Sequence, residues 1–223
     1  VSENGTRDTV YRASLADGNL TPLAPIGSIP NVGEVGMGPS GDIYAVAANN
    51  PGHGQVRRVV GGTAPVFADG LGFGYLGGLA FDDAGSVLVA DTNDPFFAGA
   101  SGRVLRLDAT GAVMETLDLE GGGGSGVYDI AWSNGALFAT TGATLTRWTP
   151  AGAEPFGAFE GMFPFPTDIA ACPDGSLIVN GNFTGAGGLF WLRPTATAVP
   201  EPGTLVLLAL SAAPLALRRR SWR

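Results

Sequence analysis

Three acidic residues occupy equivalent places in a repeated pattern and could act together. Glu34, Asp129 and Asp168 each begin an apolar stretch, and the remaining copy of the pattern has Gly78 at that place. Carboxylate oxygens are the ligands that a hard cation such as Ca²⁺ prefers, so acids that converge on one axis could form a metal site. The competing interpretation is structural, because acidic residues at strand starts also form turns and cap loop backbone.

Other residues that could do chemistry give weaker signals. His53 is the single histidine, which excludes a metal site built from several histidines, and its Pro-Gly-His-Gly sequence is typical of a solvated turn. The glycines at 121–124 have no lysine after them, so they predict a flexible connector and not a phosphate cradle. Cys172 is the single cysteine, and beside Pro173 it is expected to be a small structural thiol. The sequence therefore favours a non-enzymatic protein over an enzyme.

The acidic residues belong to a unit that recurs every 40 to 50 residues. Its first half is an apolar strand, a turn that contains glycine, and a second apolar strand. Copies of this half cover residues 34–46, 78–90, 129–139 and 168–179. Its second half is a strand that ends in arginine, and the copies place Arg12, Arg58, Arg106, Arg147 and Arg193 at 41 to 48 residues from one another. We expect these arginines to form ion pairs or backbone bonds between neighbouring units.

A period in the forties with about four short strands per unit predicts an all-β protein, a β-propeller. The fold expected is about four to five visible blades followed by a single C-terminal hydrophobic helix. The chain has five second halves and four first halves, which predicts that N-terminal sequence with at least half a blade and a signal peptide is missing. A four-bladed toroid with an additional N-terminal hairpin is the alternative.

The net charge of the chain limits the kinds of macromolecule that it could bind. The net charge is -8, and no basic stripe occurs outside the C-terminus. Binding to nucleic acid depends on cationic side chains that neutralise phosphates. The sequence therefore predicts no nucleic-acid partner.

The C-terminal residues form a tail of distinct composition. Residues 194–202 are rich in proline, threonine and alanine and predict an extended linker, and residues 203–217 carry no charge. As a helix these fifteen residues would span roughly 22 Å, less than the ~30 Å hydrocarbon core, so a buried helix or hairpin is a competing interpretation. The basic end at Arg218, Arg219 and Arg220 favours a membrane segment with its arginines in the cytoplasm.

The tail resembles the PEP-CTERM sorting signal of Gram-negative bacteria. It has the motif Val199, Pro200, Glu201 and Pro202, then the apolar segment, then the basic end. The resemblance implies that an exosortase recognises the tail at the inner membrane, with cleavage near the Pro-Glu-Pro sequence. It also implies an exported protein with a final place at the cell surface or in the extracellular matrix.

The repeat resembles the NHL, YncE-like and gluconolactonase group of propellers. The segments at 87–91 and 102–108 carry this resemblance best. In gluconolactonases, metal ligands occur at strand starts of this kind, so the resemblance implies a Ca²⁺ site at Glu34, Asp129 and Asp168. The sequence around these residues lacks the Glu-Gly-Pro and Asn-Gly signatures of that family, so the metal site and the structural role both remain open.

These observations define the expected organisation and function. The domains expected are β-propeller repeats at 1–193, a linker at 194–202, and a transmembrane or sorting helix at 203–223. The favoured function is an exported binding or adhesion scaffold for an extracellular polysaccharide or protein ligand. The alternatives are a propeller hydrolase or lactonase with a divalent metal in its central channel, and a fragment without activity in isolation.

Overall fold

The structure, a computed structural model, divides into two compact units, Val1–Leu192 and Arg193–Arg223. The residues that it describes are 2–3, 8–47, 54–70, 75–92, 102–118, 126–141, 144–150, 152–158, 165–182 and 187–193. The predicted linker and C-terminal helix lie outside these residues. The fold is therefore that of the first unit.

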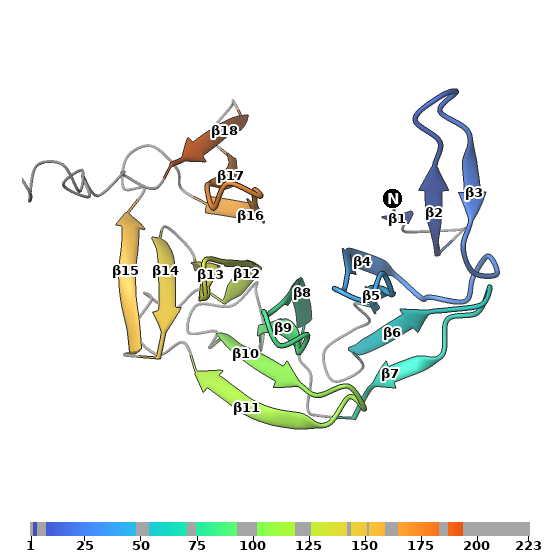
Figure 1. The fold of residues 1–223 in the computed structure, drawn as a ribbon, viewed down its shortest axis with the longest axis horizontal. Coiled ribbons are helices and arrows are strands. Elements are labelled where there is room, and N and C mark those ends of the chain that lie inside the picture. The colour runs from blue at the N-terminus through green and yellow to red at the C-terminus, as the bar shows by residue number, and fades with distance from the viewer. Residues whose placement is uncertain are drawn as a thin grey trace, which may run out of the picture. The chain divides into compact units, whose positions relative to one another are not determined.

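The described residues of the first unit form five successive antiparallel sheets, each a meander of strands that follow one another in the chain (Figure 1). The first sheet contains β1 (Ser2–Glu3), β2 (Thr9–Ala13) and β3 (Leu20–Pro22). The second contains β4 (Val32–Met37), β5 (Ile43–Ala47), β6 (Gln55–Val59) and β7 (Val66–Ala68). The third contains β8 (Tyr75–Phe81), β9 (Val87–Thr92), β10 (Gly102–Leu107) and β11 (Val113–Asp118).

The fourth sheet contains β12 (Val127–Ser133), β13 (Ala136–Thr141), β14 (Thr144–Thr149) and β15 (Gly152–Ala158). The fifth contains β16 (Phe165–Ala171), β17 (Leu177–Asn182) and β18 (Gly187–Leu192). The described residues form strands and turns and no helix. This is a β-propeller arrangement, which confirms the predicted all-β fold.

A separate hydrophobic core lies between each pair of neighbouring sheets, and the second strand of each of the three middle sheets contributes side chains to two of these cores. In β9, Val87 and Val89 pack against the second sheet, whereas Leu88 and Ala90 pack against the fourth. Successive side chains of a strand point to opposite faces, so a strand between two sheets must be apolar throughout. This explains why the second strands lack the alternation of polar and apolar residues that marks a half-exposed strand.

The turn glycines of the repeat adopt the conformation that the pattern predicts. Gly41, Gly85, Gly135 and Gly175 all have positive φ, between 72° and 82°. At Asn134-Gly135, both central residues of the two-residue hairpin have positive φ, as a type I′ turn requires. The register that these turns set determines which side chains face each neighbouring sheet.

The first strands of the second to fifth sheets contact one another in chain order: β4 with β8, β8 with β12, and β12 with β16. Each of them carries a register irregularity near its start. The predicted acidic residues lie at or directly after these irregularities. The fold therefore places them along the line where first strands meet.

Candidate functional site

The three predicted acids, named here the acidic trio, lie at matching positions of three first strands. Glu34 is in β4, Asp129 in β12 and Asp168 in β16, each directly before the residue that pairs with the middle of the second strand. The electrostatic influence of Asp168 reaches both other carboxyls, and that of Glu34 reaches Asp129. The fold thus brings together residues that are up to 134 positions apart in the sequence.

Asp129 is the buried member, with 7% of its surface exposed. Its Oδ1 accepts a hydrogen bond from the amide of Ile130 at 2.8 Å, and its Oδ2 accepts one from the amide of Ile169 at 2.8 Å. The second bond crosses from the fourth sheet to β16 of the fifth. Asp129 therefore joins two neighbouring sheets through its carboxylate.

Burial raises the pKa of Asp129 to about 8, because a charged carboxylate is poorly solvated there. The amide of Ile169 opposes this effect, and the negative charges of Glu34 and Asp168 add to it. A carboxyl with a pKa near neutrality can accept or release a proton at physiological pH. Both of its oxygens are nevertheless engaged by backbone amides.

The other two members are more accessible. Glu34 is half-buried, and burial together with the charge of Asp168 raises its pKa, while the amide of Val35 opposes the shift. Asp168 is exposed and accepts a hydrogen bond from Asn180 Nδ2 at 2.9 Å. No group of three His, Cys, Asp or Glu side chains in the described part of the chain is arranged to hold a metal ion. Metal binding by the acidic trio stays a prediction.

Gly78 shows why the third sheet has no acid at the matching position. A Cβ on Gly78 would lie 2.2 Å from Oδ1 of Asp129 and 2.5 Å from the amide nitrogen of Ile130. Its neighbour Gly77 is equally confined, since a Cβ there would lie 2.4 Å from the carbonyl oxygen of Tyr128. The absence of a side chain at Gly78 therefore leaves the space in which Asp129 packs against the backbone of the third sheet.

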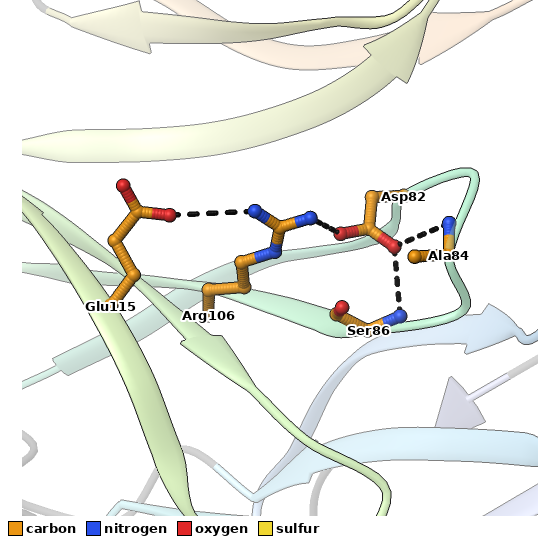
Figure 2. Close-up of polar contacts among 5 residues, drawn as sticks. All are labelled: Asp82, Ala84, Ser86, Arg106 and Glu115. Atoms are coloured by element: carbon orange, nitrogen blue, oxygen red, sulfur yellow. Dashed lines mark hydrogen bonds and ion pairs between the residues drawn. The ribbon is translucent and has the colours of Figure 1, made fainter. Parts of the chain in front are cut away.

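The expectation that the recurring arginines connect neighbouring blades is wrong for three of them. Arg58 pairs with Asp42 at 2.7 Å, and Arg147 with Glu154 at 3.1 Å, each within one sheet. Arg106 lies between Asp82 and Glu115, again within its own sheet (Figure 2). Glu115 and Glu154 lie directly opposite their arginines on the adjacent strand. Asp42 and Asp82 instead lie in the turn between the first and second strands of the same sheet.

The weaker candidates add no chemistry to this site. Cys172 is a free, half-exposed thiol in the turn after β16. His53, the glycines at 121–124, and the sorting residues Val199–Pro202 and Arg218–Arg220 lie outside the described residues. Within the described residues no helix is long and apolar enough to cross a bilayer.

Sequence reasoning missed the contacts that fix Asp129. The Oγ1 of Thr140 accepts a hydrogen bond from the amide of Asp129 at 3.0 Å, and the same hydroxyl donates a hydrogen bond to the carbonyl oxygen of Asp129 at 3.3 Å. A signal was present in the repeated Asp-Ile-Ala at 129–131 and 168–170, but it does not distinguish a metal ligand from a backbone cap.

The comparisons with known proteins address the tail and the fold separately. Residues 198–220 match the PEP-CTERM protein-sorting motif. The motif indicates a protein that is exported, passes the membrane during sorting, and is recognised by an exosortase. No curated protein matches the sequence.

Several solved structures are similar to the fold. Virginiamycin B lyase from Staphylococcus aureus is 16% identical, with a TM-score of 0.59 over 85% of this chain and 64% of that one. A gluconolactonase from Xanthomonas campestris is 17% identical, with a TM-score of 0.60 over 86% and 67%. A chain of a nidogen/laminin complex is 12% identical, with a TM-score of 0.63 over 83% and 71%. At these identities the likeness shows the fold, and the chain spans about two thirds of each neighbour's length.

Proposed function

We propose that this protein is an exported binding scaffold, which its tail delivers to the cell surface or extracellular matrix. The observation that carries the proposal is the sorting motif at residues 198–220. In this assignment residues 1–193 are the propeller, 194–202 the linker and 203–223 the sorting helix. An exosortase binds Val199, Pro200, Glu201 and Pro202 while the helix lies in the inner membrane, and Arg218–Arg220 stay cytoplasmic.

The properties of the described sheets support a binding role for the propeller. Each pair of neighbouring sheets shares its own core, so the array holds its surface side chains on a rigid frame. Both carboxylate oxygens of Asp129, the most buried acid of the trio, accept bonds from backbone amides. The neighbour from the nidogen/laminin complex is an example of this fold within a protein–protein assembly.

The tail is tested in cells of an exosortase-containing host that express the chain, fused to an export signal peptide, with and without residues 199–223. The cells are then fractionated. We expect the complete chain in the membrane and surface fractions and the shortened chain in the soluble exported fraction. A variant with Pro200→Ala and Pro202→Ala serves as the matched control for the motif alone. Equal release of the complete and shortened chains into the medium would refute sorting by the tail.

The second candidate is a propeller hydrolase or lactonase that uses a divalent metal in the central channel. The observation that favours it is the electrostatic coupling of Glu34, Asp129 and Asp168, since a cation would relieve the repulsion among them. The similar fold of a gluconolactonase is consistent with this candidate.

Added Ca²⁺ distinguishes the two functions. If the acidic trio binds Ca²⁺, added Ca²⁺ must raise the melting temperature of the parent chain, because a ligand that binds the folded state stabilises it. Asp168→Asn must then reduce the increase, while Asp108→Asn, in an exposed turn outside the trio, must leave it unchanged. An unchanged melting temperature of the parent chain in Ca²⁺ rules out the metal-dependent hydrolase.

A further inference from the structure

A cavity between the third and fourth sheets lies away from the acidic trio. It encloses about 250 Å³, and we name it the tryptophan pocket. Two facing rows of side chains form its walls. The residues that define it are Leu88, Arg106 and Glu115 of the third sheet, with Trp132, Leu137 and Trp148 of the fourth.

The cavity coincides with a change at one position of the repeat. Tyr44 lies opposite Arg58 in the second sheet, as Leu88 lies opposite Arg106 in the third. The ring of Tyr44 fills the junction between the second and third sheets, with its centroid 5.0 Å from that of Phe67 and 5.3 Å from that of Phe81. At the next junction the smaller Leu88 stands in its place, and the space remains open.

The polar groups of the pocket are fixed before any ligand arrives. Arg106 donates through Nη2 to Asp82 and through Nη1 to Glu115, the second bond at 3.4 Å (Figure 2). Asp82 is itself buried, and its Oδ1 accepts hydrogen bonds from the amides of Ala84 at 2.9 Å and Ser86 at 2.8 Å. These bonds hold the pKa of Asp82 below its usual value although burial acts in the opposite direction, so the acid stays ionised and anchors the guanidinium.

Two donors of the pocket have no acceptor. Nε1 of Trp132 and Nε of Arg106 are both shielded from solvent and unpaired among the described residues. A buried donor without a partner costs roughly 1–3 kcal/mol, so a ligand oxygen that reached either group after a small movement of its side chain would bind favourably. The pocket therefore selects for a molecule with hydrogen-bond acceptors at its edge.

The charge and shape of the pocket define the rest of the ligand. Arg106 pairs with Glu115 at the rim and with Asp82 behind it, so the site offers no uncompensated positive charge to attract an anion. Trp132 and Trp148 are half-buried and offer aromatic surface to an apolar face. The volume lies below the ~300–1,000 Å³ of pockets that take drug-sized ligands, so it suits a single ring.

We propose that the tryptophan pocket binds one pyranose ring of a neutral saccharide. A pyranose has an apolar C–H face that stacks on indole and a perimeter of hydroxyl groups that can accept from Arg106 and Trp132 and donate to Glu115. The inference rests on the proposed function, because it gives the exported binding scaffold its ligand class.

Fluorescence titration of the complete chain tests the proposal. The protein is held in a zwitterionic detergent without a sugar headgroup, and the probes are the methyl pyranosides of glucose, galactose and mannose. We expect a saturable change in tryptophan emission with at least one pyranoside. Cyclohexanol, a ring of similar size with one hydroxyl group, should bind at least about tenfold more weakly.

Three variants connect this signal to the pocket. Leu88→Phe should weaken binding at least about tenfold, because its ring fills the cavity as Tyr44 fills the preceding junction. Glu115→Ala changes a largely exposed residue and should have a similar effect, so the test does not depend on tolerance of the core substitution. Glu154→Ala removes the matching ion pair of the fourth sheet, outside the pocket, and should leave affinity unchanged.

The proposal is overturned if no pyranoside gives a saturable change. It is also overturned if Glu115→Ala binds as the parent does, or if cyclohexanol binds as tightly as the pyranosides. Because the titration uses purified protein, its failure would leave sorting by the tail standing. Failure of the fractionation experiment would in turn leave saccharide binding standing.

Discussion

Replacing Asp129 by asparagine should remove most of the alkaline loss of stability. The folded chain raises the pKa of this carboxyl to about 8, against the ordinary value of 3.8 that describes the unfolded chain. Between these values the folded protein keeps a proton that the unfolded chain has released. The contribution of Asp129 to the free energy of unfolding is therefore fully present below about pH 4 and is lost as the pH rises through about 8.

The size of the effect follows from the shift. Each pKa unit corresponds to about 1.4 kcal/mol, so a shift of this size corresponds to a loss of about 6 kcal/mol across the window for one group. An asparagine in place of Asp129 would not titrate, but its amide group would face one of the two backbone amides that the carboxylate now bonds. The variant should thus be no more stable than the parent at about pH 5 and more stable than the parent at about pH 9.

Urea unfolding, followed by tryptophan emission at several pH values, measures both chains. Asp108→Asn is the contrasting control, because bonds from Thr110 lower the pKa of Asp108 and its contribution disappears on acidification. That variant should keep the alkaline slope of the parent. If the parent loses no more stability than Asp129→Asn between about pH 5 and pH 9, the reasoning about the buried carboxyl is refuted.

Three further substitutions, two of them with a matched control substitution, test the packing of the sheets. Gly78→Ala should lower the free energy of unfolding by about 3 kcal/mol or more, because the added Cβ would collide with backbone atoms. Gly41→Ala has open space around it and should cost about 1 kcal/mol, because residue 41 has a positive φ. Equal costs for the two variants would contradict the close approach at Gly78. Thr140→Val should cost about 1–3 kcal/mol by removing two bonds to β12, and a neutral result in thermal unfolding would contradict them. Leu137→Ala, in the core between the third and fourth sheets, should cost about 2–5 kcal/mol. Leu189→Ala, at a residue 75% exposed, should change the midpoint of urea unfolding little, and a similar loss in both would contradict the assignment of the core.

The sequence predicts the repeat well because local chemistry determines it. Gly41, Gly85, Gly135 and Gly175 are needed wherever two strands reverse with positive φ, so their spacing shows the period directly. The apolar runs between them follow from strands that are covered on both faces. Fold class could therefore be predicted without knowing which sheet touches which.

The site is less predictable because it depends on contacts across sheets. An aspartate that accepts the amide of Ile169, 40 residues away, has the same local sequence as one that binds a cation. The arginines were expected to bridge blades, yet Arg106 reaches along its own sheet to Asp82. The tryptophan pocket can be recognised in the sequence only after the repeats are aligned, because Leu88 then occupies the position that Tyr44 has in the preceding repeat.

The fit of Asp129 over Gly78 has a consequence for the order of the sheets. The third sheet, which lacks a side chain at this position, can stand only beside a sheet that supplies one to cover its backbone. Placing a second copy of the third sheet next to the first would set glycine against glycine and leave an unfilled gap. The junction between the third and fourth sheets is thus specific to this pair, so the third sheet cannot be exchanged freely with another even though their strands and turns are similar.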